Sequence, residues 1–421
     1  TQHVVEKQLK AKGIKRRDLG REKFVEETWK VKAEHHRVIT SQLEKIGASC
    51  DWSRERFTLD AGLSDAVREV FVTLYERGLV YRGKYLVNWC SSCGTALADD
   101  EVEHEDKQGA MYRLRYPMAD GSGRCMEIAT TRPETLLGDV AVACHPEDER
   151  YKNLVGSMLA LPLTDRLIPL IADSYVDREF GTGLVKITPA HDINDFEIGN
   201  RHNLERINVL NPDGTLNENV PEKYRGMKVV DARAAVVEDM KALGLFVDEQ
   251  PTNHSVGHCY RCHTVVEPYL SEQWFVKMKP LAEKALKAWR DGDVKFYPQR
   301  WENTYEHWLT NIRDWCISRQ LWWGHRIPVW YCDHCGYVVV EREEPTICPK
   351  CKSTGLRQEE DVLDTWFSSW LWPFSVMGWP KETADFRKYY PTSTLVTAYD
   401  IIFFWVARMI MAGMEFTGVS P

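Results

Sequence analysis

Eight of the twelve cysteines in the sequence stand in four Cys-x-x-Cys pairs, a pattern with a direct chemical consequence. Two thiolates on one tight turn can reach the same ion, and four such thiolates suit a tetrahedral zinc ion. Two of the pairs fall in one short segment, as Cys332, Cys335, Cys348 and Cys351. This spacing is typical of a zinc ribbon. The alternative is four buried thiols that share the spacing by coincidence.

The other two pairs, Cys90/Cys93 and Cys259/Cys262, are separated by 165 residues. Each pair alone is a weak signal, but together they predict a second site that clasps the two ends of the intervening domain. Redox chemistry of the thioredoxin kind is the rival interpretation, and it is disfavoured because neither pair has a strand–helix–strand context. Each set of four cysteines would fill the four positions of a tetrahedral zinc ion, so neither set leaves a coordination position open for a substrate. The sequence therefore predicts two zinc ions, both with a structural role.

Two polar segments, 130–139 and 181–196, combine hydroxyls, a cation and carboxylates over a short length. Lys186 and Thr188 alternate along an expected strand, so they share one face of it. A cation, a hydroxyl and carboxylates that converge suit a small polar substrate with an amino group, or the positioning of a water molecule.

Asp192 and Asp195 are three residues apart, which places them on one face of an expected helical turn. The plainer interpretation is that these residues form caps and turns, with Asp192 as a helix N-cap. The sequence contains neither Gly-x-Ser-x-Gly nor His-Glu-x-x-His, so serine hydrolases and zinc proteases of those classes are excluded.

Composition limits the class of protein. The chain has 421 residues, of which 43% are apolar and 28% charged, which is ordinary for a water-soluble protein of two to four domains. With Lys+Arg 54 and Asp+Glu 62 the net charge is −8, so a uniformly basic nucleic-acid coat is excluded, although a local basic groove is not. The basic run 10–17 would contact phosphate or form a solvated helix end.

No segment predicts a membrane span. The longest apolar run, Ile401–Gly413, is interrupted by Arg408 and is shorter than the ~20 residues that a spanning helix needs. No secretory signal opens the chain, and it begins with Thr1, so we expect a cytoplasmic protein and a piece of a longer one. Periodicity predicts helices over residues 1–85, including 60–81, an α+β domain in the middle, and a strand over 393–397.

The polar segments resemble a known family. TTRPETLLGDVAV and GTGLVKITPAHDINDFEIGNRH are similar to the two signature blocks of the editing domain in the class I aminoacyl-tRNA synthetases for valine, isoleucine and leucine. Lys186 and Asp192 resemble the valyl-tRNA synthetases, since the isoleucine branch usually carries His and Gly there. LVNWCSSCGTALADDEVEH, ISRQLWWGHRIPVWYC and DVLDTWFSSWLWPFSVMGWP resemble the same family, so the likeness extends over nearly the whole chain.

The resemblance implies an α/β multidomain fold, with a partial Rossmann-type catalytic core split by an inserted α+β editing domain and zinc-ribbon knuckles. The expected segments are the first part of the core (1–85), the first strand pair of a zinc knuckle (86–108), the editing domain (109–252), a return segment with the second half of that knuckle (253–330), a second zinc ribbon (331–360) and the second part of the core (361–421).

The sequence departs from the family at both ends. The HIGH-type motif is expected before Thr1 and the KMSKS-type motif after Pro421, and neither occurs in the chain. Both motifs bind ATP phosphates and stabilise the transition state of adenylate formation. We therefore expect ATP and Mg²⁺ to be substrates of the full enzyme only, and this internal fragment to make no valyl-adenylate by itself.

Site residues follow from the resemblance alone. It implies a valine pocket at Trp366, Asp400, Ile401 and Trp405, with Asp400 on the α-amino group. It implies an editing site that hydrolyses mischarged Thr-tRNA(Val) with a positioned water and no protein nucleophile. Asp195 would bind the amino group, Lys186 and Thr188 the substrate or the water, and Arg132 the terminal adenosine. The expected editing residues are Thr131, Arg132, Phe180, Lys186, Thr188, Asp192 and Asp195.

The resemblance also implies tRNA(Val), valine and threonine as partners, and a monomer. Two alternatives remain open at this point. One is a zinc-stabilised tRNA-binding module without catalysis, which fits the cysteine pairs and the absent ATP motifs. The other is an isoleucyl-tRNA synthetase, against which Lys186 and Asp192 stand. Hydrolysis of Thr-tRNA(Val) or of Val-tRNA(Ile) separates these possibilities.

Overall fold

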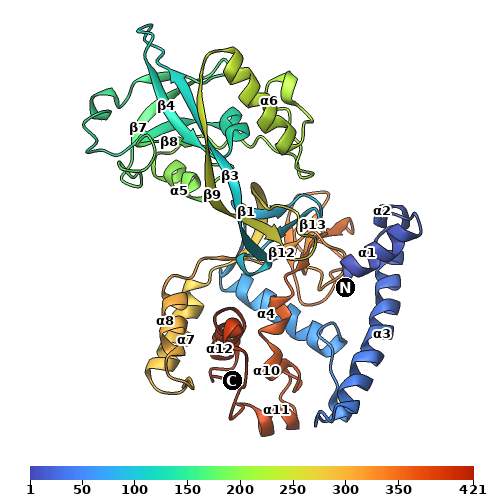
Figure 1. Cartoon of the computed structure of the whole chain (residues 1–421). Coiled ribbons are helices and arrows are strands. Elements are labelled where there is room, and N and C mark those ends of the chain that lie inside the picture. The colour runs from blue at the N-terminus through green and yellow to red at the C-terminus, as the bar shows by residue number, and fades with distance from the viewer. The chain divides into compact units, whose positions relative to one another are not determined.

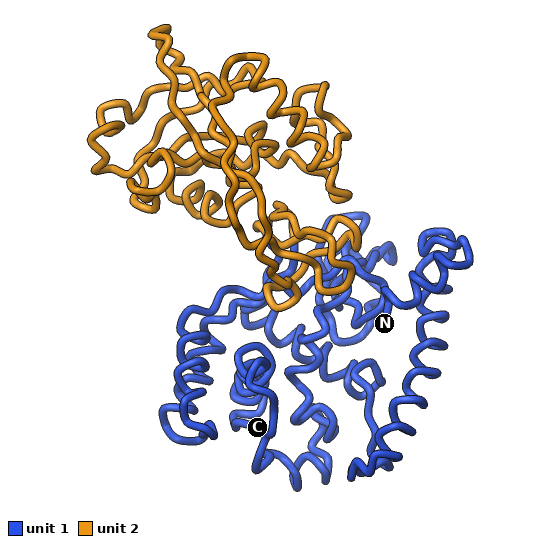
Figure 2. The backbone as a smooth tube through the Cα atoms, viewed as in Figure 1, with its two compact units in different colours: residues 1–83, 273–421 blue, residues 84–272 orange.

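The computed structural model describes residues 1–421, and these divide into two compact units (Figure 2). Unit 1 comprises Thr1–Gly83 and Gln273–Pro421, and unit 2 comprises Lys84–Glu272. Helices and several separate sheets occur together, so the prediction of a mixed α/β protein is confirmed (Figure 1). None of the helices combines the length and the hydropathy that crossing a bilayer requires.

The chain begins with four helices, α1 (Gln2–Ala11), α2 (Arg16–Leu19), α3 (Arg21–Lys45) and α4 (Ala61–Glu76). Helix α4 begins at a cap, because Oδ1 of Asp60 accepts a hydrogen bond of 2.9 Å from the backbone N–H of Leu63. The prediction that helix continues to residue 85 is wrong. Gly78 adopts a φ of +69° after α4, and the chain then enters strand β1 (Val80–Cys90).

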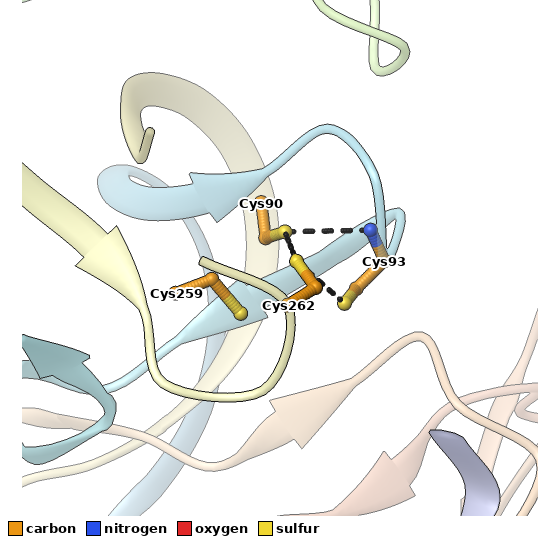
Figure 3. A group of neighbouring side chains, drawn as sticks. All are labelled: Cys90, Cys93, Cys259 and Cys262. Atoms are coloured by element: carbon orange, nitrogen blue, oxygen red, sulfur yellow. Dashed lines mark hydrogen bonds between the residues drawn. The ribbon is translucent and has the colours of Figure 1, made fainter. Parts of the chain in front are cut away.

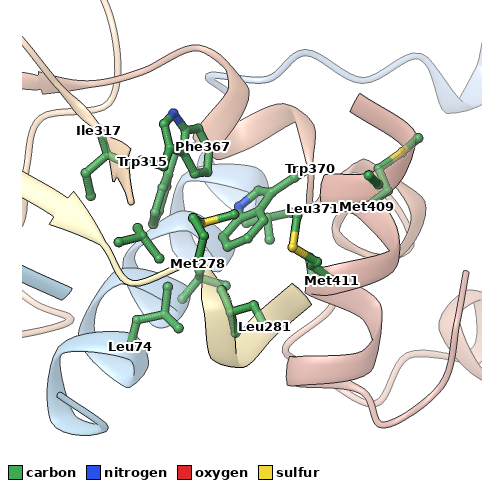
Figure 4. Close-up of a cluster of buried hydrophobic side chains, with 14 of the residues drawn as sticks. Leu74, Met278, Leu281, Trp315, Ile317, Phe367, Trp370, Leu371, Met409 and Met411 are labelled. Carbon is green, nitrogen blue, oxygen red and sulfur yellow. The ribbon is translucent and has the colours of Figure 1, made fainter. Parts of the chain in front are cut away.

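The core of unit 1 forms where apolar faces of α4, α7 (Lys279–Arg290) and α12 (Ala407–Phe416) meet short helical segments (Figure 4). Trp370 and Leu371 lie at its centre, and both are completely buried. Burial of these large side chains supplies the main driving force for folding the unit. The remaining helices of this unit are η1 (Trp52–Arg54), α8 (Trp301–Thr310), α9 (Trp366–Ser369), α10 (Trp372–Ser375), α11 (Ala384–Tyr389), η6 (Tyr399–Ile401) and η7 (Ile402–Val406).

Apart from β10, the strands of the later part of the chain are short. A three-stranded antiparallel sheet has the order β14-β13-β15, and β12 pairs with β16. Strand β10 pairs antiparallel with β11 through Phe275 and Cys316. The bounds are β10 (Glu267–Val276), β11 (Trp315–Cys316), β12 (Ser318–Arg319), β13 (Val329–Cys332), β14 (Val338–Val340), β15 (Leu356–Gln358) and β16 (Val362–Leu363).

The strand predicted over 393–397 does not form. Residues 393–397 are irregular, and Leu395 and Val396 are 50% and 90% exposed. A strand requires a neighbour for its backbone N–H and C=O groups, and no strand in the chain pairs with this segment. The strand-like composition of this segment was therefore insufficient to determine its structure.

Two of the sheets lie wholly within unit 2. One has the order β6-β7-β5-β8, with β5 parallel to β7 and antiparallel to β8. The other has the order β4-β3-β9, in which β3 (Val102–Pro117) and β9 (Phe246–Cys259) form a long antiparallel ribbon. The other elements are β2 (Thr95–Leu97), η2 (Asp99–Glu101), β4 (Cys125–Thr130), η3 (Pro133–Gly138), β5 (Ala141–Cys144), η4 (Lys152–Leu154), β6 (Met158–Ala160), β7 (Leu167–Ala172), β8 (Leu184–Ile187), α5 (Ile193–Arg201), η5 (Glu222–Tyr224) and α6 (Val229–Ala242).

The core of unit 2 lies between its sheets and helix α6. Leu114 and Tyr116 of β3, Leu170 of β7 and Val236 of α6 are completely buried there. The six-segment organisation expected from the sequence is finer than the division into two units and stays a prediction. The core nevertheless fixes β5 and β8, and these strands position the polar residues described below.

Candidate functional site

Cys90, Cys93, Cys259 and Cys262 converge at one end of the β3–β9 ribbon (Figure 3). Their Sγ atoms all lie within 4.8 Å of one another. The Sγ of Cys262 is 3.4 Å from that of Cys90 and 3.5 Å from that of Cys93. The ribbon explains the convergence. Its register places Val102, which follows the first cysteine pair, opposite Cys259 of the second pair, so both pairs lie at the same end of the ribbon. This is the convergence that the sequence predicted.

The second cluster contains Cys332, Cys335, Cys348 and Cys351, whose Sγ atoms also lie within 4.8 Å of one another. Cys332 ends strand β13, and its Sγ is 3.5 Å from that of Cys351. The Sγ atoms of Cys335 and Cys348 are 3.8 Å apart. Both clusters could bind a metal ion.

All four Cys-x-x-Cys turns share one backbone conformation. The residue after each second cysteine has a positive φ: Gly94 (+64°), His263 (+56°), Gly336 (+68°) and Lys352 (+61°). Its N–H donates to the carbonyl of the first cysteine at 2.8 to 2.9 Å in every case. Two of these residues are not glycine, so they adopt a left-handed conformation that costs free energy. The recurrence of one turn at four places indicates a common requirement for aiming paired thiols.

The polar residues of unit 2 form a buried cluster around Lys186. Its Nζ donates to Oγ1 of Thr135 at 2.8 Å, to Oδ1 of Asp139 at 3.0 Å and to Oγ1 of Thr188. An ammonium group has three protons, so these contacts use its whole donor capacity. Lys186 therefore orients Thr188 and Asp139, and a substrate would have to displace one of these partners to contact it.

Asp139 is the acceptor at the centre of this cluster. Thr188 and Lys186 donate to its Oδ1, and the Tyr116 hydroxyl donates to Oδ2 at 2.7 Å. Burial raises the pKa of Asp139, and the Lys186 ammonium is the largest effect that opposes the rise. Sequence reasoning gave Asp139 no role. Its place at the end of the first polar segment was the available signal, whereas nothing in the sequence connects it with Tyr116.

Asp192 and Asp195 have different environments. Asp192 is the exposed N-cap of α5, and its Oδ1 accepts from the N–H groups of Asn194 and Asp195 at 2.8 and 3.1 Å. This is the capping role that the plainer interpretation predicted. Asp195 is 6% exposed, and its Oδ2 accepts from the Thr188 N–H at 2.8 Å, whereas Oδ1 has no donor in the chain. Burial, reinforced by the Asp192 carboxylate, raises the pKa of Asp195 to about 7.

Arg132 is a cross-link within unit 2. Its guanidinium forms ion pairs with Glu134 and Glu267 and donates to the carbonyl of His191 at 3.0 Å. His191 is buried, which lowers its pKa to about 3, and its Nε2 accepts from the Val209 N–H at 2.9 Å. The neutral ring therefore carries its proton on Nδ1, which lies 3.3 Å from the Pro268 carbonyl.

The two remaining residues expected at the editing site lie at its margins. Thr131 is half-buried between the end of β4 and Arg132. Phe180 is 68% exposed in the loop before β8, and no hydrogen bond or ring contact joins its side chain to the cluster. The structure thus brings Lys186, Thr188 and Asp195 together and leaves Phe180 apart.

The residues expected in a valine pocket lie in unit 1. The rings of Trp366 and Trp405 are 6.3 Å apart, and the Trp405 indole donates to the Ser369 carbonyl at 3.1 Å. Both rings are partly buried and pack against the core of the unit. Asp400 is exposed in η6, and Ile401 beside it is half-buried.

Comparison with known proteins places these residues in context. Residues 1–421 match the family model described as tRNA synthetases class I (I, L, M and V). Proteins named valine–tRNA ligase are similar over the whole chain: that of Treponema denticola at 66% identity, that of Geobacter sulfurreducens at 60% and that of Thermotoga maritima at 57%. These matches cover 100% of this chain but 47%, 47% and 49% of those proteins. The chain thus spans about half the length of the curated relatives it matches.

A solved ternary complex of the LeuRS of Agrobacterium radiobacter with tRNA and LeuAMS is similar at a TM-score of 0.42 and 15% identity. That likeness covers 98% of this chain and 55% of the other. At this level it transfers no structural detail to the residues described above.

Proposed function

The chain belongs to the class I tRNA synthetases (I, L, M and V), and from this membership we propose that it is part of a valine–tRNA ligase. We propose further that unit 2 hydrolyses threonine that has been attached to tRNA(Val) by mistake. Identities of 57 to 66% with proteins named valine–tRNA ligase favour this assignment over the isoleucine enzyme and over a module without catalysis. For the hydrolytic activity the supporting observation is the carboxyl of Asp195 beside the Lys186–Thr188–Asp139 cluster.

A physical limit explains why such an activity is needed. An apolar pocket shaped for valine cannot strongly reject threonine, which has nearly the same shape and adds only a hydroxyl. A second site that hydrogen-bonds this hydroxyl can select threonine, because valine would leave the polar groups of that site unpaired. The buried hydroxyls and charges around Lys186 pair with one another, so the threonine hydroxyl would have to take the place of one of these partners.

In the proposed hydrolysis, Oδ1 of Asp195 binds the ammonium group of the threonyl ester. A water molecule attacks the ester carbonyl, its oxygen forms the new bond to carbon, and the bond to the ribose oxygen of the tRNA breaks. The proton lost by the water passes to the leaving ribose oxygen. Thr188, held by Lys186 and Asp139, orients the substrate or the water.

The relatives named valine–tRNA ligase are about twice as long as this chain, and we assign the synthetic reaction to a protein of that length. We propose that it activates valine with ATP and Mg²⁺ and charges tRNA(Val). In that reaction Asp400 binds the α-amino group of valine, and Trp366, Ile401 and Trp405 limit the size of the side chain. The ring contact between Trp366 and Trp405 supports this placement.

Both cysteine clusters fit structural zinc. Tetrahedral zinc with bonds of about 2.3 Å to sulfur requires sulfur atoms about 3.8 Å apart. The Sγ–Sγ distances of 3.4, 3.5, 3.5 and 3.8 Å across the two clusters are close to this value. Four cysteines leave no position for a substrate, so zinc would fix the turns and take no part in catalysis.

Deacylation of Thr-tRNA(Val) by this chain tests the hydrolytic proposal. We expect clearance by the wild type, and loss of clearance in Lys186→Ala and Asp195→Asn. Lys152→Ala, which removes an exposed ion pair with Glu149 in the same unit, is the matched control and should retain activity. A folded, zinc-loaded wild type that leaves the ester intact would contradict the proposal, and faster clearance of Val-tRNA(Ile) would favour the isoleucine enzyme.

A further inference from the structure

Unit 1 contains a cavity of about 330 Å³ that none of the residues discussed so far explains. Helix α3 contributes Trp29 to its wall, the segment after β12 contributes Trp322 and Trp323, and β13 contributes Trp330. The rings of Trp29 and Trp323 are 4.9 Å apart at an interplanar angle of 75°. Trp29 is 41% exposed, so part of its indole surface is open to solvent.

The charge around the cavity is predominantly positive. Arg68 of α4 lines it and has neither a hydrogen bond nor an ion pair in the chain. Arg326 donates only to the backbone carbonyls of Glu359 and Gln358, at 2.7 and 3.0 Å, so no carboxylate neutralises it. Arg342, in contrast, is neutralised by two glutamates of α4, and the single carboxylate in the wall is that of Glu344. The cavity therefore favours an anionic ligand.

One buried hydrogen-bonding group in the wall lacks a partner. His325 lines the cavity, and its Nε2 is shielded from water without a hydrogen bond, while its Nδ1 lies 3.5 Å from the Ser64 hydroxyl. The indole N–H groups of Trp29, Trp322 and Trp323 likewise donate to nothing in the chain. A ligand with a polar edge would accept hydrogen bonds from one or more of these indole groups, whereas the His325 Nε2 is closed off from the cavity as it is from solvent.

We propose that this cavity binds one unstacked nucleotide, with its base against Trp29 and Trp323 and its phosphate on Arg68. Aromatic side chains stack on any base, and a guanidinium binds phosphate through charge-assisted hydrogen bonds. A simple anion would leave the aromatic wall unused, and a cationic ligand would be repelled by the arginines. The volume lies in the range of small-molecule sites, at about 300–1,000 Å³.

This site is distinct from the hydrolytic cluster of unit 2 and goes beyond the proposed function. A nucleotide of this chemistry can come from an RNA strand whose base is splayed out, or from a free mononucleotide. The two sources differ because only an RNA strand has flanking phosphates, which would contact Arg326. Comparing RNA with AMP therefore distinguishes them.

Binding to the 421-residue chain tests the proposal with three probes: AMP and adenosine by equilibrium dialysis, and a fluorescein-labelled single-stranded RNA tetranucleotide by anisotropy. We expect Arg68→Gln to weaken AMP about tenfold and adenosine hardly at all, because adenosine has no phosphate. We expect Trp29→Ala to weaken AMP and adenosine alike, about tenfold, whereas Trp29→Phe retains stacking and binding. Matched controls in the same unit are Tyr297→Ala, an aromatic that is 86% exposed, and the exposed Arg313→Gln.

Each outcome of these binding measurements supports or overturns the proposal of a nucleotide site. Tighter binding of RNA than of AMP, with both reduced in Arg68→Gln, assigns the site to an RNA strand, and equal binding assigns it to a free nucleotide. The proposal is overturned if Arg68→Gln and Trp29→Ala both bind AMP and RNA as the controls do, or if the wild type binds neither. Loss of Thr-tRNA(Val) clearance has no bearing on this result, so the two proposals fail separately.

Discussion

The Nζ of Lys186 lies 3.0 Å from Oδ1 of Asp139, and the two side chains are 9% and 0% exposed. Burying both charges costs solvation free energy, and the pair recovers it only when geometry and hydrogen bonds are complete. They are complete here, because Thr135, Thr188 and Tyr116 occupy the remaining hydrogen-bonding positions. The pair thus holds the Thr188 hydroxyl in one orientation, and this orientation depends on both charges being present.

Removing one member of this pair should therefore be costly. In Asp139→Asn the buried Lys186 ammonium loses its counter-charge, and we expect the free energy of unfolding to fall by about 3–5 kcal/mol. The double variant Asp139→Asn/Lys186→Met should lose less than the two single variants summed, since no unpaired charge remains. Urea unfolding measures both quantities.

Lys152→Met provides the matched control. It breaks the ion pair of Lys152 with Glu149, whose side chains are 40% and 78% exposed. Pairs of this kind contribute less than about 1 kcal/mol. If Asp139→Asn is no more destabilising than Lys152→Met, then the buried pair does not organise the cluster.

The Asp195 carboxyl should make stability depend on pH. Its pKa is about 7 in the folded chain against an ordinary value of 3.8, so the folded state holds this proton longer. The contribution of this carboxyl to the free energy of unfolding is fully present below about pH 4 and is lost as pH rises through 7. Its size is about 1.4 kcal/mol per unit of difference between the folded and unfolded pKa values. Asp195→Asn has no proton to lose. The wild type should therefore lose stability relative to Asp195→Asn between pH 4 and 8.

Asp231→Asn is the control for this measurement, because Asp231 is exposed in the first turn of α6 in the same unit. Its stability difference from the wild type should stay nearly constant between pH 5 and 8. A constant difference for Asp195→Asn as well would mean that burial does not perturb this carboxyl. In the deacylation reaction, binding of the substrate ammonium should improve as pH rises through 7.

The sequence predicted features that depend on local spacing. The cysteine pairs, the Asp192 cap and the shared face of Lys186 and Thr188 each lie within a few residues, where turn, helix and strand geometry determine position. The convergence of Cys90 with Cys259 is a long-range contact. It could still be predicted, because each Cys-x-x-Cys pair supplies two of the four ligands that a tetrahedral zinc site requires.

Features that depend on distant partners were missed. The Asp139 acceptor is completed by Tyr116 of β3, and Arg132 is paired with Glu267, 135 residues further along the chain. Only the folded structure shows that Arg132 is already paired with buried carboxylates, whereas the family resemblance placed it on the terminal adenosine. The prediction of a strand over 393–397 was wrong for a related reason. A strand forms only where a neighbouring strand can pair with it, and the sequence of the segment alone does not show whether such a neighbour exists.

Arg132 should accordingly act as a structural cross-link. Arg132→Gln leaves Glu134 and Glu267, which are 1% and 12% exposed, without this partner, and we expect a loss of about 3 kcal/mol in unfolding free energy. Adding Glu267→Gln should restore part of the loss, because one buried carboxylate is then removed. Arg178→Gln, which breaks an exposed contact of 3.8 Å with Glu147, is the control and should change little. Failure of Glu267→Gln to compensate would indicate that Arg132 acts outside this ion-pair network.

The two cysteine clusters should bind metal independently, because they share no residue and belong to different units. We expect two zinc ions per chain by elemental analysis, one after Cys348→Ser and one after Cys259→Ser. Cys50→Ser, an exposed cysteine outside both clusters, should retain two. Chelation should lower the unfolding temperature of the wild type more than that of either cluster variant, since binding free energy at such sites is folding free energy. Equal metal content in Cys348→Ser and Cys50→Ser would show that the Cys332–Cys351 cluster binds no metal.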